Sequence, residues 1–252
     1  MARLATFTCL IAAAAAAGCG SDRPSRGEGT VEVVATIGPV ADLIANAGGR
    51  RVHVTRLVPL GGDPHAWRPS PAAREAVSRA DLVVRSGGAI DAWAEGAGAE
   101  RELTLLPLVE PLGDDPHWWQ DPVRAQRAAK EVRNELARVD VDGAGHYEAA
   151  TADLLARLRK LDRGIRRCLD RVPRPWPRIA TQHAGFAYFG ERYGVAIADS
   201  RGRGASAGRR LWADTLGRSG TEAASYLGAM AANAGAIVDG LSGGEASCRL
   251  RP

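Results

Sequence analysis

Two copies of one tripeptide, Asp63-Pro64-His65 and Asp115-Pro116-His117, carry the residues of this sequence best suited to chemistry, and a further histidine, His183, follows later. Proline fixes its own φ near −65° and biases the preceding residue toward extended geometry, so each motif is expected to hold an imidazole at a set angle. Zinc is bound by histidine nitrogen and carboxylate oxygen at about 2.0 to 2.2 Å, so its ligands must converge on one point. The three histidines therefore predict a metal site built from distant segments.

A single histidine in a loop is more often a solvated polar residue than a metal ligand. The repetition of the tripeptide favours ligation for His65 and His117. Two other histidines are interpreted as non-ligands, because His53 lies in the strand-like pattern Val-His-Val-Thr and His146 follows a glycine at the start of a helical stretch.

The segments around these motifs alternate between short apolar strands and helices. The pattern predicts strands at 31–36, 52–58, 81–85 and 103–108 and helices at 40–47, 71–79 and 90–97. Such alternation is typical of an α/β fold of parallel β-α-β units with helices covering the sheet. His65 and His117 each follow a strand, so both are expected at the carboxyl edge of the sheet, where open α/β sheets bind their ligands.

Two long helical stretches follow at 121–138 and 143–169, and Pro122 stands in the first turn of the former. The second stretch keeps apolar residues at helical spacing over about 27 residues, or roughly 40 Å at 1.5 Å per residue. A helix of that length predicts a rigid connection between two lobes. Three closely spaced prolines then end the helical pattern, and a strand predicted at 178–181 delivers His183.

The first 18 residues have the features of a secretory signal peptide. Arg3 precedes an apolar run that is too short to cross a bilayer and ends in small residues. Gly18-Cys19 resembles a bacterial lipoprotein processing site, with Ala16 where leucine is commonest, and Cys19 would then become the lipidated first residue. An ordinary secretory cleavage is the alternative. Residues 19–30 are mostly polar, glycine and proline residues, which predicts a tether outside any core.

With 252 residues and 45% hydrophobic content, the chain can bury one large core or two modest ones. The net charge of +4 could suggest a polyanion partner, but the arginines are scattered through helical stretches and no basic stripe is interleaved with aromatic residues. No nucleic-acid partner is therefore expected. An exported chain meets an oxidising environment, in which Cys168 and Cys248 could form a disulfide, although the sequence leaves open whether they do.

Several segments stand in order along most of the mature chain: Gly62–Pro71, Asp81–Val84, Asp115–Pro122, Thr181–Phe189, Leu211–Leu216, Ser225–Leu227 and Asn233. Together they resemble the zinc/manganese class of solute-binding proteins, which are the extracytoplasmic receptors of metal ABC importers. The resemblance implies His65, His117, His183 and Asp214 as four metal ligands, and a receptor rather than an enzyme. It also implies a monomeric membrane lipoprotein, facing the extracellular or periplasmic side, that delivers its metal to a membrane permease.

Three neutral imidazoles and one carboxylate form a four-coordinate donor set that suits Zn²⁺, whereas Mn²⁺ prefers more oxygen ligands. The resemblance agrees, because manganese receptors of the family offer a carboxylate where this chain has His183. We therefore expect Zn²⁺ as the bound ion, with Mn²⁺ as the alternative. Asp63 and Asp115 have two open interpretations: they hydrogen-bond ring nitrogens or backbone amides near the ligands, or they cap their loops.

The expected organisation is a signal peptide at 1–18, a lipidated tether at 19–30, an N-terminal metal-binding lobe at 31–120, linking helices at 121–172 and a C-terminal lobe at 173–252. The interval 196–210 is short for the family, so at least one β-α unit, on the order of 30 residues, is expected to be missing from the C-terminal lobe.

Two other functions stay open. One is a zinc-dependent hydrolase with Asp63 or Asp115 as general base, which is weakened because the sequence lacks the His-Glu-x-x-His and Gly-x-Ser-x-Gly motifs. The other is a surface binding or adhesion protein that has lost transport because its C-terminal lobe is shortened.

Overall fold

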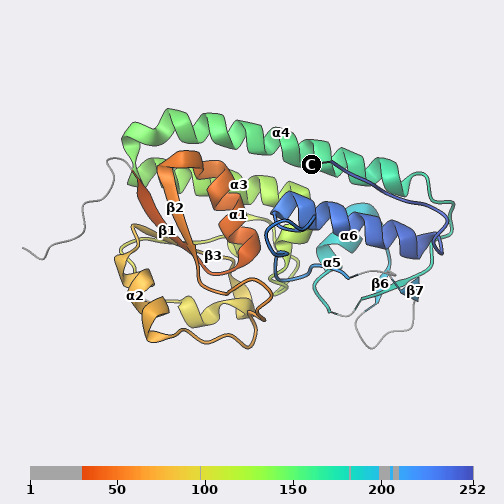
Figure 1. Ribbon diagram of the computed structural model, residues 1–252, viewed down its shortest axis with the longest axis horizontal. Coiled ribbons are helices and arrows are strands. Elements are labelled where there is room, and N and C mark those ends of the chain that lie inside the picture. The colour runs from red at the N-terminus through yellow and green to blue at the C-terminus, as the bar shows by residue number, and fades with distance from the viewer. Residues whose placement is uncertain (1–29, 97, 182, 199–204, 207–209, 252) are drawn as a thin grey trace, which may run out of the picture.

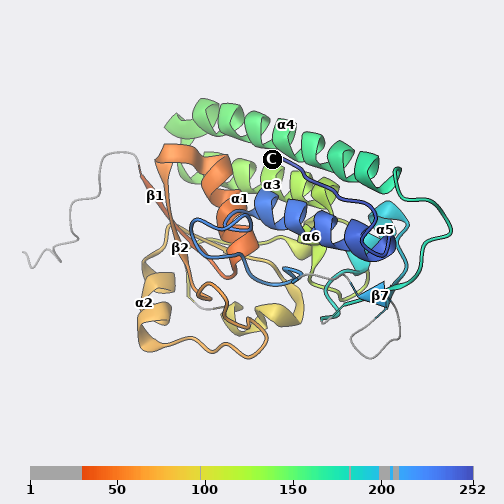
Figure 2. The same ribbon diagram turned by 45° about the vertical axis from the view of Figure 1, so that its right-hand side comes forward.

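The computed structural model describes residues 30–96, 98–181, 183–198, 205–206 and 210–251. The predicted signal peptide and most of the tether, including Cys19, lie outside the described residues. The described chain forms two α/β lobes side by side, with one long helix running along the edge of both (Figures 1 and 2). The predicted α/β fold with two lobes and a long connecting helix is confirmed.

The first lobe is built on a four-stranded parallel sheet with the strand order β2-β1-β3-β4. Its strands are β1 (Val31–Ala35), β2 (Val52–Arg56), β3 (Leu82–Arg85) and β4 (Glu102–Thr104), and its crossover helices include α1 (Gly38–Gly48) and α2 (Pro71–Arg79). β1 pairs with β2 from Val31 opposite Val52 onward. All four residues of β3 are buried, which is expected for an inner parallel strand with both faces covered.

Two helices link the lobes, α3 (Pro122–Val139) and α4 (Ala144–Leu169). α3 begins at Pro122 because Asp121 caps it, its carboxylate accepting a hydrogen bond of 2.7 Å from the backbone N–H of Val123. α4 buries one apolar stripe, which includes Leu154, Leu158, Leu161 and Ile165. This stripe packs against helices of both lobes, since α4 contacts α1 and α3 as well as α6 (Tyr226–Leu241).

The second lobe has a smaller parallel sheet, ordered β6-β5-β7. Its strands β5 (Ile179–Ala180), β6 (Ile197–Ala198) and β7 (Ala205–Ser206) have two residues each, and α5 (Ala187–Tyr193) lies between β5 and β6. Three buried aromatic residues of α5, Tyr188, Phe189 and Tyr193, supply much of the apolar packing that the short strands cannot. Whether this lobe lacks a β-α unit stays a prediction, since much of 196–210 lies outside the described residues.

Two predicted elements are wrong. In place of a helix at 90–97, the chain makes two 3₁₀ turns, Gly88–Ile90 and Ala92–Ala94. The buried carboxylate of Asp91 accepts hydrogen bonds from the backbone N–H groups of Ser86 (2.6 Å) and Gly87 (2.9 Å), which folds the segment back on the end of β3. The strand predicted at 103–108 ends at Thr104, because Pro107 has no N–H to donate and the chain turns into a 3₁₀ helix over Leu106–Leu108.

Cys168, at the end of α4, and Cys248, in the C-terminal segment, form a disulfide with their Cα atoms 5.5 Å apart. Replacing both cysteines by serine is expected to lower the free energy of unfolding by about 4 kcal/mol, because the bond closes a loop of 80 residues in the unfolded chain. Urea unfolding of the oxidised protein and of the double variant measures the difference. Equal midpoints and slopes would show that the disulfide does not stabilise the folded protein.

Candidate metal centre

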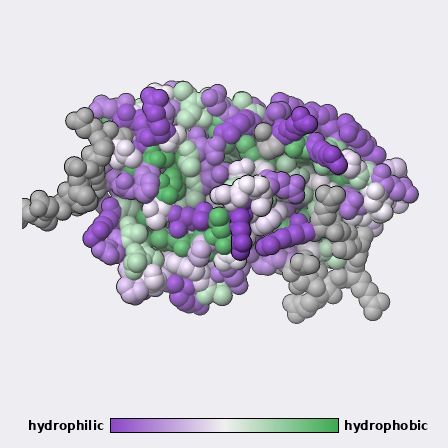
Figure 3. All heavy atoms as spheres, in the orientation of Figure 1, coloured by the Kyte–Doolittle hydropathy of each residue, from purple (hydrophilic) through white to green (hydrophobic). Residues whose placement is uncertain are grey.

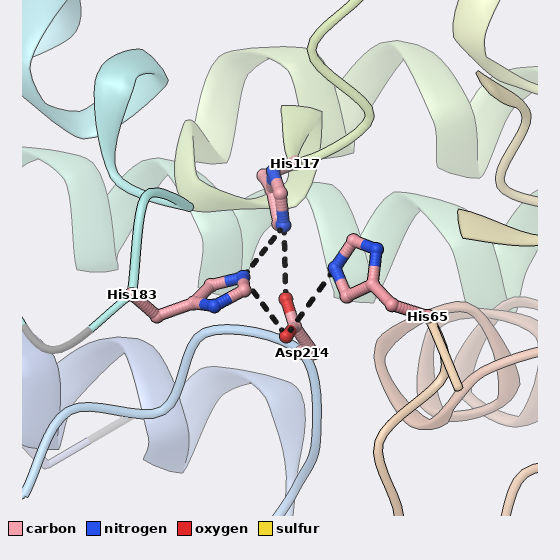
Figure 4. Close-up of side chains that lie close together, drawn as sticks. All are labelled: His65, His117, His183 and Asp214. Atoms are coloured by element: carbon pink, nitrogen blue, oxygen red, sulfur yellow. Dashed lines mark hydrogen bonds and ion pairs between the residues drawn. The ribbon is translucent and has the colours of Figure 1, made fainter. Parts of the chain in front are cut away.

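His65, His117, His183 and Asp214 meet at one point between the two lobes. Each offers one ligand atom, and these atoms all lie within 4.8 Å of one another. Figure 4 shows the three imidazoles arranged around the carboxylate of Asp214. Nε2 of His117 is 2.9 Å from Oδ1 of Asp214, and Nε2 of His183 and of His65 are 3.0 Å and 3.7 Å from its Oδ2. The structure therefore brings together all four residues that the sequence proposed as ligands.

The topology of the two sheets explains this convergence. His65 follows β2, His117 follows β4, His183 follows β5 and Asp214 follows β7. Because both sheets are parallel, each pair of loops emerges from the carboxyl edge of its own sheet. The first lobe contributes two histidines and the second contributes a histidine and the carboxylate, so a bound ion would join the lobes.

The two Asp-Pro-His motifs form the same turn but differ at the imidazole. Oδ1 of Asp63 accepts a hydrogen bond of 2.9 Å from the backbone N–H of His65, and Oδ1 of Asp115 accepts one of 3.0 Å from that of His117. Oδ1 of Asp115 also lies 2.5 Å from Nδ1 of His117. Asp63 therefore only caps its loop, whereas Asp115 both caps its loop and fixes the ring that it faces.

This contact determines which nitrogen of His117 faces the site. With the Nδ1 proton donated to Asp115, Nε2 is the nitrogen that faces Asp214. Burial by itself lowers the pKa of His117, but the hydrogen bond to Asp115 and the ion pair with Asp214 outweigh it and raise the pKa to about 9. Without a metal ion, a proton therefore occupies Nε2 at neutral pH.

The pKa of Asp214 is shifted in the opposite direction. Burial raises the pKa of its carboxyl, but the ion pairs with the imidazoles of His117 and His183 outweigh burial and hold the pKa well below its ordinary value. Its buried Oδ1 accepts no well-directed hydrogen bond among the described residues, although Nε2 of His117 is near. Oδ1 of Asp214 and Nε2 of His117 face each other. Once Nε2 loses its proton, both atoms are electron-pair donors, and a metal cation between them can bind to both.

The loop that carries Asp214 is fixed by hydrogen bonds from the other lobe and from α6. The indole N–H of Trp119 donates to the carbonyl of Ala213 (2.7 Å), and the side-chain amide of Gln120 donates to the same carbonyl (3.0 Å) and to that of Trp212 (2.9 Å). Asn233 of α6 accepts from the N–H of Trp212 (2.7 Å) and donates to its carbonyl (2.8 Å).

No role was predicted for Gln120 from the sequence, and Asn233 was identified only through the family resemblance. The position of Gln120 beside the Trp118-Trp119 pair and the second Asp-Pro-His motif was the one local signal for it.

A further contact joins the loop that carries His65 to the loop that carries Asp214. The hydroxyl of Thr215 accepts a hydrogen bond of 2.9 Å from the backbone N–H of Gly61.

The centre is buried on one side and open on the other. The side chains of His117 and Asp214 are 7% and 14% exposed, whereas those of His65 and His183 are 36% and 38% exposed. A metal ion can therefore enter past His65 and His183 and meet the fixed pair of His117 and Asp214 behind them.

Changing Asp115 to asparagine is expected to weaken zinc binding about 10- to 100-fold, because carboxylates that orient a ligand histidine have effects of that size. Competition with a chelating dye measures the affinity. Asp63→Asn is the matched control, since this carboxylate makes the same loop contact without reaching the ring. Equal losses in the two variants would show that Asp115 acts only on its loop.

The sequence is similar to those of known metal-binding and metal-uptake proteins. The model of a family described as "Zinc-uptake complex component A periplasmic" matches residues 33–204, a range that contains the three histidines and ends before Asp214. A manganese-binding lipoprotein, MntA of Halalkalibacterium halodurans, is 30% identical over 202 residues, which cover 75% of this chain and 67% of the relative. The high-affinity zinc uptake system protein ZnuA of Bacillus subtilis is 24% identical over 211 residues, covering 74% of this chain and 65% of the relative.

Among solved structures, the periplasmic zinc-binding protein TroA from Treponema pallidum has the same fold. Its TM-score is 0.76 at 21% identity, with 85% of this chain and all of that chain covered. The alignments thus span about two thirds of the curated relatives. In the part of the chain that the structure describes, no helix is long and apolar enough to cross a membrane.

Proposed function

Since this chain belongs to the family of periplasmic zinc-uptake components A, we propose that it captures Zn²⁺ between its two lobes and delivers the ion to the membrane permease of an ABC importer. The convergence of two ligands from each lobe on one point carries this proposal. An ion bound there bridges the lobes, and it can leave only when ligands from one lobe release it.

The donor set supports a carrier rather than a hydrolase. Zinc in a hydrolytic site keeps three protein ligands and an open position for water, whereas four protein ligands complete a tetrahedral shell. The family consists of solute-binding receptors, which agrees with that chemistry. In the proposed receptor Asp115 orients His117, and a role as general base is not needed.

The choice of Zn²⁺ over Mn²⁺ rests on the three imidazole nitrogens. Mn²⁺ favours carboxylate, carbonyl and water oxygens, and this centre offers one carboxylate. The names of the relatives include both ions, since MntA is called manganese-binding and ZnuA belongs to a zinc uptake system. The ligand types of this chain therefore support Zn²⁺, with Mn²⁺ as the competing ion.

We also propose that Cys19 carries a lipid anchor and that residues 20–30 tether the two lobes to the outer face of the cell membrane. The relative MntA is named a lipoprotein, and the sequence around Cys19 resembles a lipoprotein processing site. The proposed organisation keeps an N-terminal lobe at 31–120, linking helices at 121–172 and a C-terminal lobe at 173–252.

Metal analysis of the purified full chain tests the function. We expect one Zn²⁺ per chain after loading with equimolar Zn²⁺ and Mn²⁺ and removal of free metal, as measured by mass spectrometry of the eluted metal. No retained metal would refute the receptor proposal. Zinc-dependent hydrolysis of ester, peptide or phosphate substrates would instead support an enzyme.

A further inference from the structure

The solvent face of the C-terminal half of α4 is basic. From Ala156 to Leu169, six residues are exposed, and all but Ala156 carry a positive charge: Arg159, Lys160, Arg163, Arg166 and Arg167. Their spacing of three, four and seven or eight residues places them on one side of the helix. Figure 3 shows hydrophilic residues along this edge of the molecule. We call this set the basic face.

The C-terminal segment extends the basic face, since its Arg249 and Arg251 are exposed. The disulfide between Cys168 and Cys248 holds that segment beside α4, and Lys160 donates a hydrogen bond of 3.1 Å to the carbonyl of Arg251. The arginines are scattered along the sequence, but the fold brings those of the C-terminal segment beside those of α4.

The protein itself does not neutralise these charges. Arg159, Arg163 and Arg167 form no ion pair or side-chain hydrogen bond with any residue in the described part of the chain. Arg166 is the exception, since it lies over the ring of Tyr193 and 3.8 Å from Asp162. Asp162 is buried and already bound by Arg192, and the exposed acidic residue nearest in sequence is Asp170.

The helix dipole accounts for only part of the basic face. Positive residues stabilise a helix at its last turn, but the effect falls off beyond that turn. Arg159, Lys160 and Arg163 lie about two to three turns before the end at Leu169. Unpaired like charges this close together repel one another, so the folded protein gains no stability from them.

The position of the basic face leaves the metal centre free. α4 runs along one long edge of the molecule in both views, with α1, α3 and α6 packed against its inner side (Figures 1 and 2). The four candidate ligands lie on loops at the carboxyl ends of the strands instead. A flat partner could therefore cover the outer face of α4 without covering these loops.

We propose that the basic face rests on the anionic lipid headgroups of the membrane in which the protein is anchored. The anchor is part of the proposed function, and the eleven residues after Cys19 reach at most about 40 Å, which keeps the lobes near the lipid surface. Each basic residue close to an anionic membrane strengthens the contact roughly fivefold. The tethered receptor then lies with α4 toward the lipid and its metal centre exposed for capture.

Cysteine reporters in the lipidated full chain test this orientation. Once the signal peptide is removed, Cys19 is lipidated and Cys168 is bonded to Cys248, so an introduced cysteine is the only free thiol. Ala156→Cys places it on the basic face, and Ala72→Cys places it on the exposed surface of α2. The rate of labelling by a soluble maleimide is measured on vesicles of phosphatidylcholine alone and on vesicles with about one third phosphatidylglycerol.

We expect labelling at position 156 to be at least about tenfold slower on the anionic vesicles than on the neutral ones, and labelling at position 72 to be unchanged. About 1 M salt should abolish the difference, because the screening length falls to about 3 Å. Replacing Arg159, Lys160, Arg163 and Arg167 by glutamine should restore fast labelling. Replacing Arg50, Arg74, Arg79 and Arg101 by glutamine removes the same amount of charge elsewhere. Labelling at position 156 on anionic vesicles should then stay slow.

Equal rates on the two kinds of vesicle would overturn the proposal, and so would slow labelling that survives the α4 substitutions. Protection on neutral vesicles by added double-stranded DNA, without protection on anionic vesicles, would assign the basic face to a nucleic acid instead. Zinc content is measured for every variant, so that a failure of metal binding is distinguished from a failure of membrane contact.

Discussion

Replacing His117 by alanine is expected to abolish stable zinc binding. The change removes a proposed ligand and also leaves Asp115 without the ring that it orients, so the loss of affinity should exceed the roughly 10- to 100-fold typical of changes to an orienting residue. Isothermal titration, or competition with a chelating dye, measures the loss. His117 is the most buried of the four proposed ligands, with 5% of the residue exposed, so it is the one that solvent can replace least well.

Two controls separate metal binding from folding. His53→Ala also removes a histidine of the first lobe, but His53 is exposed and its ring pairs with Glu32 away from the site, so zinc binding should be unchanged. Circular dichroism and thermal unfolding of the metal-free variants show whether each remains folded. Zinc binding that persists at wild-type affinity in folded His117→Ala protein would exclude this cluster as the metal centre.

The three histidines were accessible from the sequence because each follows a predicted strand. His65 and His117 also have a proline beside them, and such patterns are visible without any knowledge of the fold. Parallel β-α-β units then predict where such loops emerge, and the structure places His65 and His117 at that edge. Asp214 was different, since no local pattern distinguishes it from the other aspartates of the sequence and only the family resemblance identified it.

The contacts that fix Asp214 could not be predicted from the sequence. Gln120 reaches the carbonyls of Trp212 and Ala213 across more than ninety positions, and Asn233 completes the same network from α6. Such pairings depend on how the two lobes pack, which local propensity does not encode. The failure at 90–97 has a similar cause, because the buried carboxylate of Asp91 determines that turn through its contacts with Ser86, Gly87 and Thr36.

The basic face of α4, unlike these contacts, has a pattern that is visible in the sequence. Its positive residues recur at helical spacing, but the apolar stripe of the same helix was the feature that predicted structure. Only the burial of that stripe shows which charged residues face solvent together. The periodicity of apolar residues thus predicts which side of a helix is buried. It does not predict what the exposed side binds.

Replacing His183 by glutamate is expected to lower the preference for Zn²⁺ over Mn²⁺ by at least about tenfold, because the centre then offers two imidazoles and two carboxylates and Mn²⁺ favours oxygen ligands. The side chain of His183 is 38% exposed, so the exchange removes little packing. Affinities for the two ions, each measured by competition with the same chelator, give the ratio. The absolute affinity for Zn²⁺ should fall as well, since a second carboxylate next to Asp214 adds repulsion in the metal-free protein.

His183→Gln is the matched control, because glutamine offers a side-chain oxygen without the charge. If selectivity follows ligand charge and type, glutamate should shift the ratio toward Mn²⁺ and glutamine should weaken both ions together. An unchanged ratio in the glutamate variant would mean that the ligand at this position does not set the preference. Selectivity would then have to come from the rigid pair of His117 and Asp214, whose positions are fixed by Asp115 on one side and by Trp119 and Gln120 on the other.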